Sequence, residues 1–265
     1  LKTRDYFSYY LTLKSNFISF QDNWKLNVEP DPAETRNYGR WSQYAENILL
    51  KRRHLSLIAN ITKAQIKRLE SAGIKTIDDI VNSSIEKIPK LNSYVLKRLK
   101  DQAKLQISSE NKNKPDFKIL PNDNLRSIGL SLLAPHSDFD VYFDIEGFPH
   151  IEGGLEYLWG ATYFNKLEER KFIDFWAHDP IQEKQAFADF VDWVFDRWRK
   201  DPSMHIYHYG SYEVTALRRL MGRYGIKEYK VDTLLRNQVF IDLYNVVRNG
   251  VLIGEPSYSI KNVER

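Results

Sequence analysis

The chain has 265 residues, of which 42% are hydrophobic and 14% aromatic, and this is enough apolar material for one large or two modest folded domains. It contains no cysteine, which excludes disulfides, thiolate zinc sites, iron–sulfur clusters and cysteine nucleophiles. No stretch approaches the roughly 18 apolar residues of a membrane span, and the first residues carry no signal-peptide pattern, so we expect a cytoplasmic protein without a membrane partner.

The charge is distributed unevenly along the chain. Residues 1–115 carry 21 Lys and Arg against 12 Asp and Glu, a net charge of +9, whereas residues 116–265 carry 18 against 23, a net charge of −5. A basic part beside an acidic part suits a nucleic-acid grip next to a metal-dependent active site. A basic surplus is equally common on solvated helices, and the charge alone leaves both interpretations open.

The first 53 residues give weak signals. Residues 6–13 fit either a helix or a strand, and residues 30–35 predict a turn followed by a helix through Leu50. The chain begins without methionine, so we expect residues 1–53 to be an incomplete piece of a larger domain.

Residues 54–108 predict a small all-helical module. Short helices are expected to begin at Thr62, Thr76, Ser83 and Ser93. Thr62 and Gln65 form a capping-box pattern, and Gly73 is suited to end the helix that it opens. Residues 69–76 also resemble the hairpin of helix-hairpin-helix modules, which hold phosphates through backbone amides and lysines. Gly73 is explained equally well as a simple helix stop.

Residues 109–135 are predicted to be a linker. Residues 108–116, at the boundary between module and linker, are polar and contain proline, which is typical of a flexible connection. The linker would separate the helical module from a domain spanning residues 136–265.

Strand and helix signals alternate in this last domain. Strands are predicted at residues 140–145, 156–164, 171–176 and 205–209, and helices from Pro180 and from Ser211 to about residue 224. The first three strands should form an antiparallel meander, and a helical and loop segment should hold residues 239–244. The order βββαβα predicts an α/β fold with the mixed sheet of ribonuclease H-like domains.

Asp144 and Glu146 lie two residues apart at the end of the first predicted strand of this domain. Side chains at positions i and i+2 of a strand point to the same face, so the two carboxylates would share one site while Phe143 and Ile145 pack on the other face. Like charges this close persist in a half-buried setting only with a shared proton or a cation between them. A divalent metal ion is the simplest such cation, and a solvated strand end is the alternative.

Four blocks of sequence carry a family resemblance. They are residues 143–147, 154–160, 207–217, and 242–244 together with 257–264. In this order they resemble the ribonuclease H-like exonuclease domain of RecB-like nucleases, a relative of the DEDD 3′–5′ exonucleases. The resemblance implies that residues 1–53 are the end of a RecB-type nuclease domain and that a helicase domain often belongs to the same full-length chain.

The resemblance also implies the site residues. Asp144 and Glu146 match the first exonuclease motif, Glu213 takes the place of the second-motif aspartate, and Asp242 matches a recurrent family acid, with a helix cap as its alternative. These acids would bind two Mg²⁺ or Mn²⁺ ions, with Asp144 bridging both, Glu146 holding the ion that activates water and Glu213 completing the shell. We expect Tyr212 to be a core residue, and His205 and His208 to be strand residues satisfied by hydrogen bonds.

Two departures from the family pattern limit the resemblance. The final motif, a tyrosine with a nearby aspartate, would lie beyond Arg265, so this chain is expected to bind metal weakly, and an inactive fragment is one of the outcomes allowed. The family's iron–sulfur cysteines would fall around residues 37–50, where this chain has none.

The expected activity is metal-dependent hydrolysis of nucleic acid, as a 3′–5′ DNA exonuclease. Two alternatives stay open. One is a noncatalytic nucleic-acid-binding module that retains the acids without the activity, and the other is an RNA-directed nuclease, because a ribonuclease H-like core does not choose the sugar.

Overall fold

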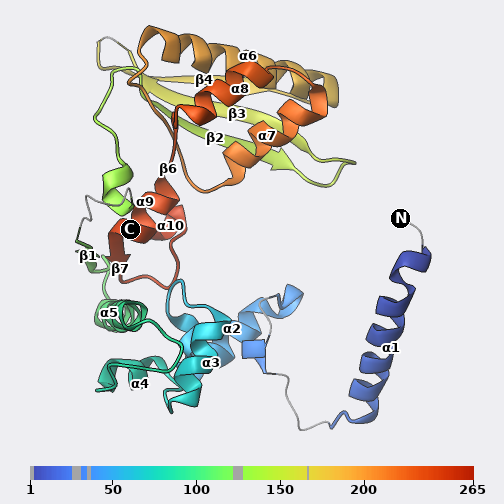
Figure 1. The fold of residues 1–265 in the computed structure, drawn as a ribbon, viewed down its shortest axis with the longest axis vertical. Helices are drawn as coiled ribbons and strands as arrows, with labels where there is room; N and C mark the ends of the chain where they lie inside the picture. Colours follow the sequence, from blue (N-terminus) through green and yellow to red (C-terminus); the bar gives the residue numbers. More distant parts are fainter. Residues whose placement is uncertain (1–2, 26–30, 35–36, 122–127, 166) are drawn as a thin grey trace.

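The structure is a computed structural model of the chain, and it describes residues 3–25, 31–34, 37–121, 128–165 and 167–265. Figure 1 shows a lobe of strands and helices, a helical lobe, and a thinner connecting layer between them. The first long helix stands apart from all three.

The N-terminal segment forms a helix whose described residues are all exposed. After a 3-10 turn, η1 (Thr3–Tyr6), α1 (Phe7–Asp22) resolves the predicted ambiguity in favour of helix, and it buries none of its residues. The 3-10 turns η2 (Pro32–Glu34) and η3 (Gly39–Trp41) lead into α2 (Ser42–Lys51), which confirms a helix close to Leu50. The predicted turn at residues 30–35 falls partly outside the described residues.

The helical lobe follows its capping signals. It contains η4 (Leu55–Leu57), α3 (Lys63–Ser71), α4 (Ile77–Asn82) and α5 (Ser93–Ser109). The predicted capping box is present, because the N–H of Gln65 donates to Thr62 Oγ1 (3.3 Å) and the N–H of Thr62 donates to Gln65 Oε1 (2.8 Å). Gly73, with a φ of +83°, lies two residues past the end of α3, in a conformation that favours glycine. Three of the four predicted helices are therefore confirmed.

The prediction of a helix beginning at Ser83 is wrong. Ser83 ends α4 as its C-cap in an extended conformation, and its Oγ accepts the N–H of Ile85 at 3.1 Å. Lys100 of α5 donates to the carbonyl oxygens of Ser83 and Ile85 at 2.8 and 2.7 Å. These carbonyls are therefore held by a side chain from another helix, and Pro89 cannot donate the N–H that a continuing helix needs.

The lobe of strands and helices contains a mixed five-stranded sheet. Its strands are β2 (Val141–Phe148), β3 (Leu155–Phe164), β4 (Arg170–Trp176), β5 (Ile206–His208) and β6 (Phe240–Asp242), in the order β4-β3-β2-β5-β6. The first three strands pair antiparallel, and β5 and β6 run parallel to β2. This confirms the predicted α/β fold with a ribonuclease H-like sheet. In the segment expected to be helix and loop, residues 239–244, the edge strand β6 was not predicted, whereas the expected helix is present from Leu243 onward.

Three helices build one core with this sheet. They are α6 (Pro180–Lys200), α7 (Tyr212–Tyr224) and α8 (Glu228–Arg236), the last of which the sequence did not indicate. Asp179 caps α6, because its Oδ1 accepts the N–H groups of Ile181 and Gln182 at 2.8 Å each. Phe187 and Phe190 of α6 are fully buried against Trp159 of β3. The inner face of β2 joins the same cluster.

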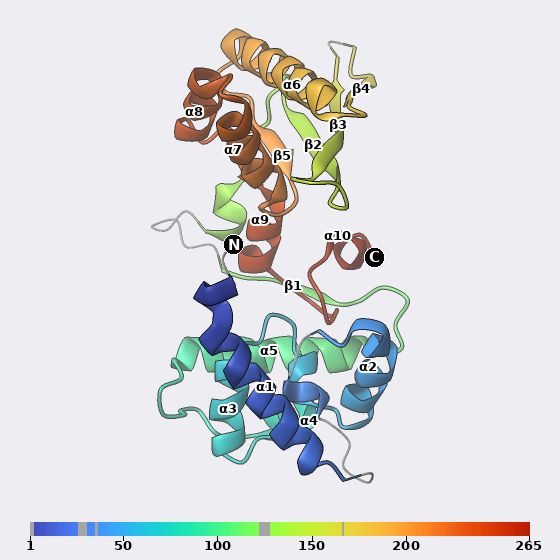
Figure 2. The same ribbon diagram turned by 90° about the vertical axis from the view of Figure 1, so that its right-hand side faces the viewer.

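The connecting layer joins segments that are far apart in sequence. It consists of β1 (Phe117–Ile119), η5 (Gly129–Leu132), α9 (Leu243–Gly250), β7 (Val251–Ile253) and α10 (Ile260–Val263). In Figure 2 this layer lies between the two lobes. The predicted linker, residues 109–135, thus contains a strand that pairs antiparallel with β7, and Ser108 and Ser109 belong to α5. The division of the chain into domains remains a prediction. None of the described helices has the length and apolar character that crossing a membrane requires.

Candidate active site

The two acidic residues predicted on the first sheet strand lie on the open face of β2. Buried and exposed side chains alternate along this strand, so Phe143 and Ile145 point into the core while Asp144 and Glu146 point away from it. Phe143 stacks on Phe190 of α6, with ring centroids 4.1 Å apart, and fixes the buried side of the strand. The predicted shared face of the two carboxylates is therefore confirmed.

Glu213 is brought next to Asp144 by the start of α7. It lies in the first turn of that helix and is 3% exposed, and its negative charge acts on the carboxyl group of Asp144. Partial burial raises the pKa of Asp144, and the charges of Glu213 and Glu146 raise it further, whereas the N–H of Ile145, 2.9 Å from Asp144 Oδ1, acts in the opposite direction. Bringing these negative charges together creates a place that a cation would stabilise.

A buried histidine contacts the carboxylate of Glu213. Nδ1 of His208, at the end of β5, lies 3.2 Å from Glu213 Oε2, and both side chains are buried. His208 is thus the hydrogen-bonded strand residue that we predicted. The same prediction is wrong for His205, whose buried Nδ1 has no hydrogen-bond partner among the described residues.

Asp242 lies at the end of β6, where it caps α9. Its Oδ1 accepts the N–H groups of Gly210 and Tyr244 at 2.9 Å each and of Asn245 at 3.4 Å. It does not line the cavity that holds Asp144, and it faces a neighbouring cavity of about 740 Å³ instead. The structure therefore places Asp144 and Glu146 on one face of β2 and Glu213 in the first turn of α7, and Asp242 takes its alternative role as the cap of α9.

A mostly apolar cavity of about 490 Å³ opens beside the carboxylates. Asp144 and Glu146 line it together with aromatic and aliphatic side chains from other strands, among them Leu158 and Tyr207. Across it, Phe172 covers Gly160, where an added Cβ would lie 3.3 Å from the ring. An apolar wall beside charged oxygens is suited to hold the flat rings of an organic substrate next to a polar reacting group.

A second group of residues next to Glu146 was missed by the sequence analysis. The Tyr212 hydroxyl donates to the carboxylate of buried Glu156, 2.8 Å from Oε2, and Arg219 pairs with the same carboxylate. Burial and this hydrogen bond raise the pKa of Tyr212 to about 12. Tyr212 is 49% exposed, so its predicted place in the core is wrong.

Gly147 makes room for this group. An added Cβ would lie 2.3 Å from the Tyr212 hydroxyl and 2.5 Å from Glu156 Oε2. The glycine directly after Glu146, at a register shift between β2 and β3, was therefore the available sequence signal for a close approach.

The side chains only partly fit a metal centre. Carboxylate oxygens are the ligands that Mg²⁺ and Mn²⁺ prefer, and the carboxyl groups of Asp144 and Glu213, which influence each other electrostatically, are of the type that would hold one such ion. Within the part of the chain that the structure describes, no group of three or more His, Asp or Glu residues is arranged to hold a metal ion. The expected convergence of several acids on two ions is thus not formed here.

Comparison with known proteins yields one match. Residues 141–265 match the RNase H superfamily, and the match begins at the first residue of β2 and covers Asp144, Glu146, Glu213 and Asp242. The searches of curated proteins and of solved structures gave no match.

Proposed function

Because residues 141–265 form an RNase H superfamily domain, we propose that this domain hydrolyses phosphodiester bonds of nucleic acid in a metal-dependent reaction. The observation that carries the proposal is the placement of Asp144 and Glu146 on one face of β2, with Glu213 in the first turn of α7, where partial burial and then the charges of Glu213 and Glu146 raise the pKa of Asp144. Such a pairing of acids costs free energy unless a proton or a cation compensates it. Many members of this superfamily are nucleases, and a nucleic-acid substrate suits the fold.

We assign Asp144 and Glu213 as the residues that would hold a Mg²⁺ or Mn²⁺ ion. Glu146, on the same face of β2, is the carboxylate available for the second ion that the resemblance to DEDD exonucleases implies. A bound ion would supply a lowered pKa for water and neutralise charge on the leaving oxygen. His208 holds the oxygen of Glu213 that it contacts, so the other oxygen stays available for a ligand.

The finer parts of the proposal rest on the resemblance. From the resemblance we propose a DNA substrate and 3′–5′ polarity. We also propose that residues 1–53 are a remnant of a RecB-type domain, that residues 54–108 are a helix-hairpin-helix-like module, and that the full-length chain contains a helicase. Asp242 also belongs here as a catalytic or ligand residue, and its three accepted N–H bonds favour a positioning role between β6 and α9.

The test is cleavage of end-labelled single-stranded DNA and RNA with Mg²⁺, Mn²⁺ or EDTA. We expect Asp144→Asn and Glu213→Gln each to lower the metal-dependent rate by at least about 100-fold. The control Asp189→Asn removes an exposed acid from α6 and should leave the rate unchanged. Substrates labelled at the 5′ or the 3′ end report polarity, since a 3′–5′ enzyme releases the 3′ label first and shortens the 5′-labelled strand stepwise.

A noncatalytic nucleic-acid-binding module is the second candidate. It is favoured by one observation, which is that no three acidic or histidine side chains among the described residues converge on a metal position. Binding of oligonucleotides without cleavage under either metal ion, by the wild-type protein and both variants alike, would establish it and exclude the enzyme.

A further inference from the structure

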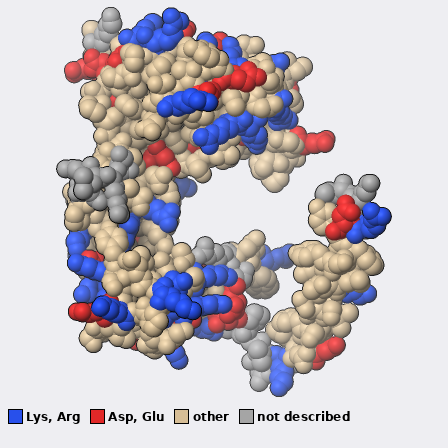
Figure 3. Space-filling view, in the orientation of Figure 1, with Lys and Arg blue, Asp and Glu red and all other residues tan. Residues whose placement is uncertain are grey.

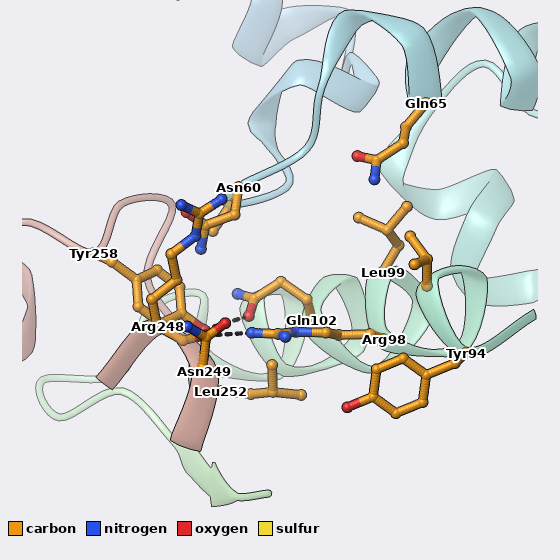
Figure 4. Close-up of a pocket in the computed structure, with 12 residues that line it drawn as sticks. Asn60, Gln65, Tyr94, Arg98, Leu99, Gln102, Arg248, Asn249, Leu252 and Tyr258 are labelled. Carbon is orange, nitrogen blue, oxygen red and sulfur yellow. Dashed lines mark hydrogen bonds between the residues drawn. The ribbon is translucent and has the colours of Figure 1, made fainter. Parts of the chain in front are cut away.

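A polar cavity of about 200 Å³ lies where the helical lobe meets the connecting layer. Figure 4 shows Tyr94, Arg98 and Gln102 along α5, with Arg248 and Asn249 of the C-terminal segment beside them. Tyr94, Arg98 and Gln102 are four residues apart in turn, so they lie on one face of the helix. Among the residues that the structure describes, the cavity lining includes two arginines and no carboxylate.

The walls of this cavity are fixed by buried hydrogen bonds. Gln102 is 3% exposed, and its Nε2 donates to the carbonyl of Ile253 in β7 at 2.8 Å. The hydroxyl of buried Tyr258 donates to Gln102 Oε1 at 2.8 Å. The helical lobe and the C-terminal segment are thus joined by satisfied polar groups, and the cavity between them is preorganised.

The two arginines form no ion pair with any acid that the structure describes. Arg98 donates through Nη2 to the backbone carbonyl of Arg248, and the Arg248 guanidinium lies 5.8 Å from the ring centroid of Tyr244. Neither arginine pairs with a carboxylate among the described residues. Each guanidinium carries five N–H donors, so most of them remain available for an anion.

Uncharged groups complete the lining. Asn60 and Gln65 border the cavity from the helical lobe, and Gln65 uses its Oε1 in the helix cap, which leaves its Nε2 amide as a donor. Tyr94, which is 65% exposed, borders the cavity as well. Figure 3 shows Lys and Arg side chains along this layer and on the helical lobe.

We propose that this cavity binds a phosphate group of a nucleic-acid backbone. Two guanidinium groups that pair with no described carboxylate, beside neutral amides, match the charge and the acceptor oxygens of a phosphodiester. The cavity is smaller than the roughly 300 Å³ at which sites for whole organic ligands begin, so it suits one phosphate with part of its sugar. The exposed ring of Tyr94 provides a face on which a base can stack. The substrate class rests on the proposed function, whereas the binding itself does not require catalysis.

The position of the cavity connects it to the candidate active site. It shares Asn60 and Tyr258 with the neighbouring cavity of about 740 Å³. That cavity in turn shares Tyr209 and Ile260 with the one lined by Asp144. Three adjoining hollows therefore lead from the arginines to the carboxylates, and a strand anchored at Arg98 and Arg248 would extend toward the acids.

The experiment is fluorescence anisotropy of labelled single-stranded oligonucleotides, measured in EDTA at several salt concentrations so that no cleavage occurs. Arg98→Gln and Arg248→Gln should each weaken binding by about tenfold at low salt and reduce the salt slope by about one unit. Arg199→Gln removes the same charge from an exposed position at the end of α6, and it should bind like the wild type at moderate salt.

Thermal unfolding of each variant separates binding from folding. Arg248→Gln keeps the backbone carbonyl that Arg98 contacts, so it remains informative if Arg98→Gln is destabilised. Equal affinity of wild type, Arg248→Gln and Arg199→Gln would overturn the proposal. Stabilisation by inorganic phosphate that Arg248→Gln abolishes, with unchanged oligonucleotide affinity, would reveal a site for small phosphates and would also overturn the nucleic-acid assignment. If the arginine variants bind more weakly but the wild-type protein cleaves no substrate, the phosphate-binding role of the cavity is supported and the proposed nuclease activity is rejected.

Discussion

Gly147→Ala is expected to disturb the site more than any other loss of a glycine in β2 or β3. The added Cβ would lie 2.3 Å from the Tyr212 hydroxyl and 2.5 Å from Glu156 Oε2, closer than real side chains allow. Glu156 cannot move aside easily, because it is 1% exposed and is held by both Tyr212 and Arg219. The methyl group should therefore break the Tyr212–Glu156 hydrogen bond.

The expected cost follows from that contact. A hydrogen bond to a charged group contributes about 1.5–3 kcal/mol, and replacing glycine offsets about 0.4–1 kcal/mol of this by restricting the unfolded chain. Gly147→Ala should then lower the free energy of unfolding by about 1–2 kcal/mol. In a Tyr212→Phe background the hydroxyl is already absent, so the two substitutions together should cost less than their sum by about 1 kcal/mol.

Urea unfolding, followed by tryptophan fluorescence, measures these values on the wild type, both single variants and the double variant. Trp159 is fully buried in the core and reports its loss. Gly222→Ala is the matched control, since nothing lies within 4 Å of its added Cβ in α7, and it should stabilise the protein by about 0.5–1 kcal/mol. The reasoning is refuted if Gly147→Ala unfolds at the wild-type urea concentration, or if its cost and that of Tyr212→Phe are simply additive.

Two further outcomes test other parts of the structure. Gln102→Met removes the buried bond to the carbonyl of Ile253 and should lower the free energy of unfolding by about 1–3 kcal/mol; an unchanged thermal midpoint would contradict this. Burial and the hydrogen bond to Glu183 raise the pKa of Tyr224 to about 12 from the ordinary value of 10.0. The contribution of Tyr224 to stability is therefore complete below pH 10 and is lost as the pH rises toward 12. The free energy of unfolding, measured between pH 9 and 11, should depend less on pH in Tyr224→Phe than in the wild type. An equal pH dependence in the two proteins would show that Tyr224 is not responsible.

Local signals predicted the elements that local contacts form. The capping box at Thr62 and Gln65 needs only neighbouring residues, and the period-two alternation through Phe143 and Asp144 needs only one buried face. Both were therefore visible in the sequence. Ser83 carries the same kind of start signal, but Lys100, from a different helix, occupies the carbonyls of that segment.

Long-range pairing was less visible. The three residues of β6 and the three of β1 are too short to show a period, and each becomes a strand only by pairing with a partner far along the chain. At the site, Asp144 and Glu146 could be found by their spacing. Tyr212 contacts Glu156, which lies 56 positions away in the sequence, and Gln102 contacts Tyr258, which lies 156 positions away. No periodic pattern in the sequence predicts contacts over such separations.

The central claim is that a divalent cation compensates the paired carboxyl groups of Asp144 and Glu213. Anomalous diffraction from crystals soaked in Mn²⁺ tests this most directly, with Asp144→Asn crystals soaked in the same way for comparison. The account predicts a manganese peak in contact with Asp144 and Glu213 of the wild type and its loss in the variant. Wild-type crystals that show no anomalous peak in contact with Asp144 or Glu213 after the same soak would contradict it.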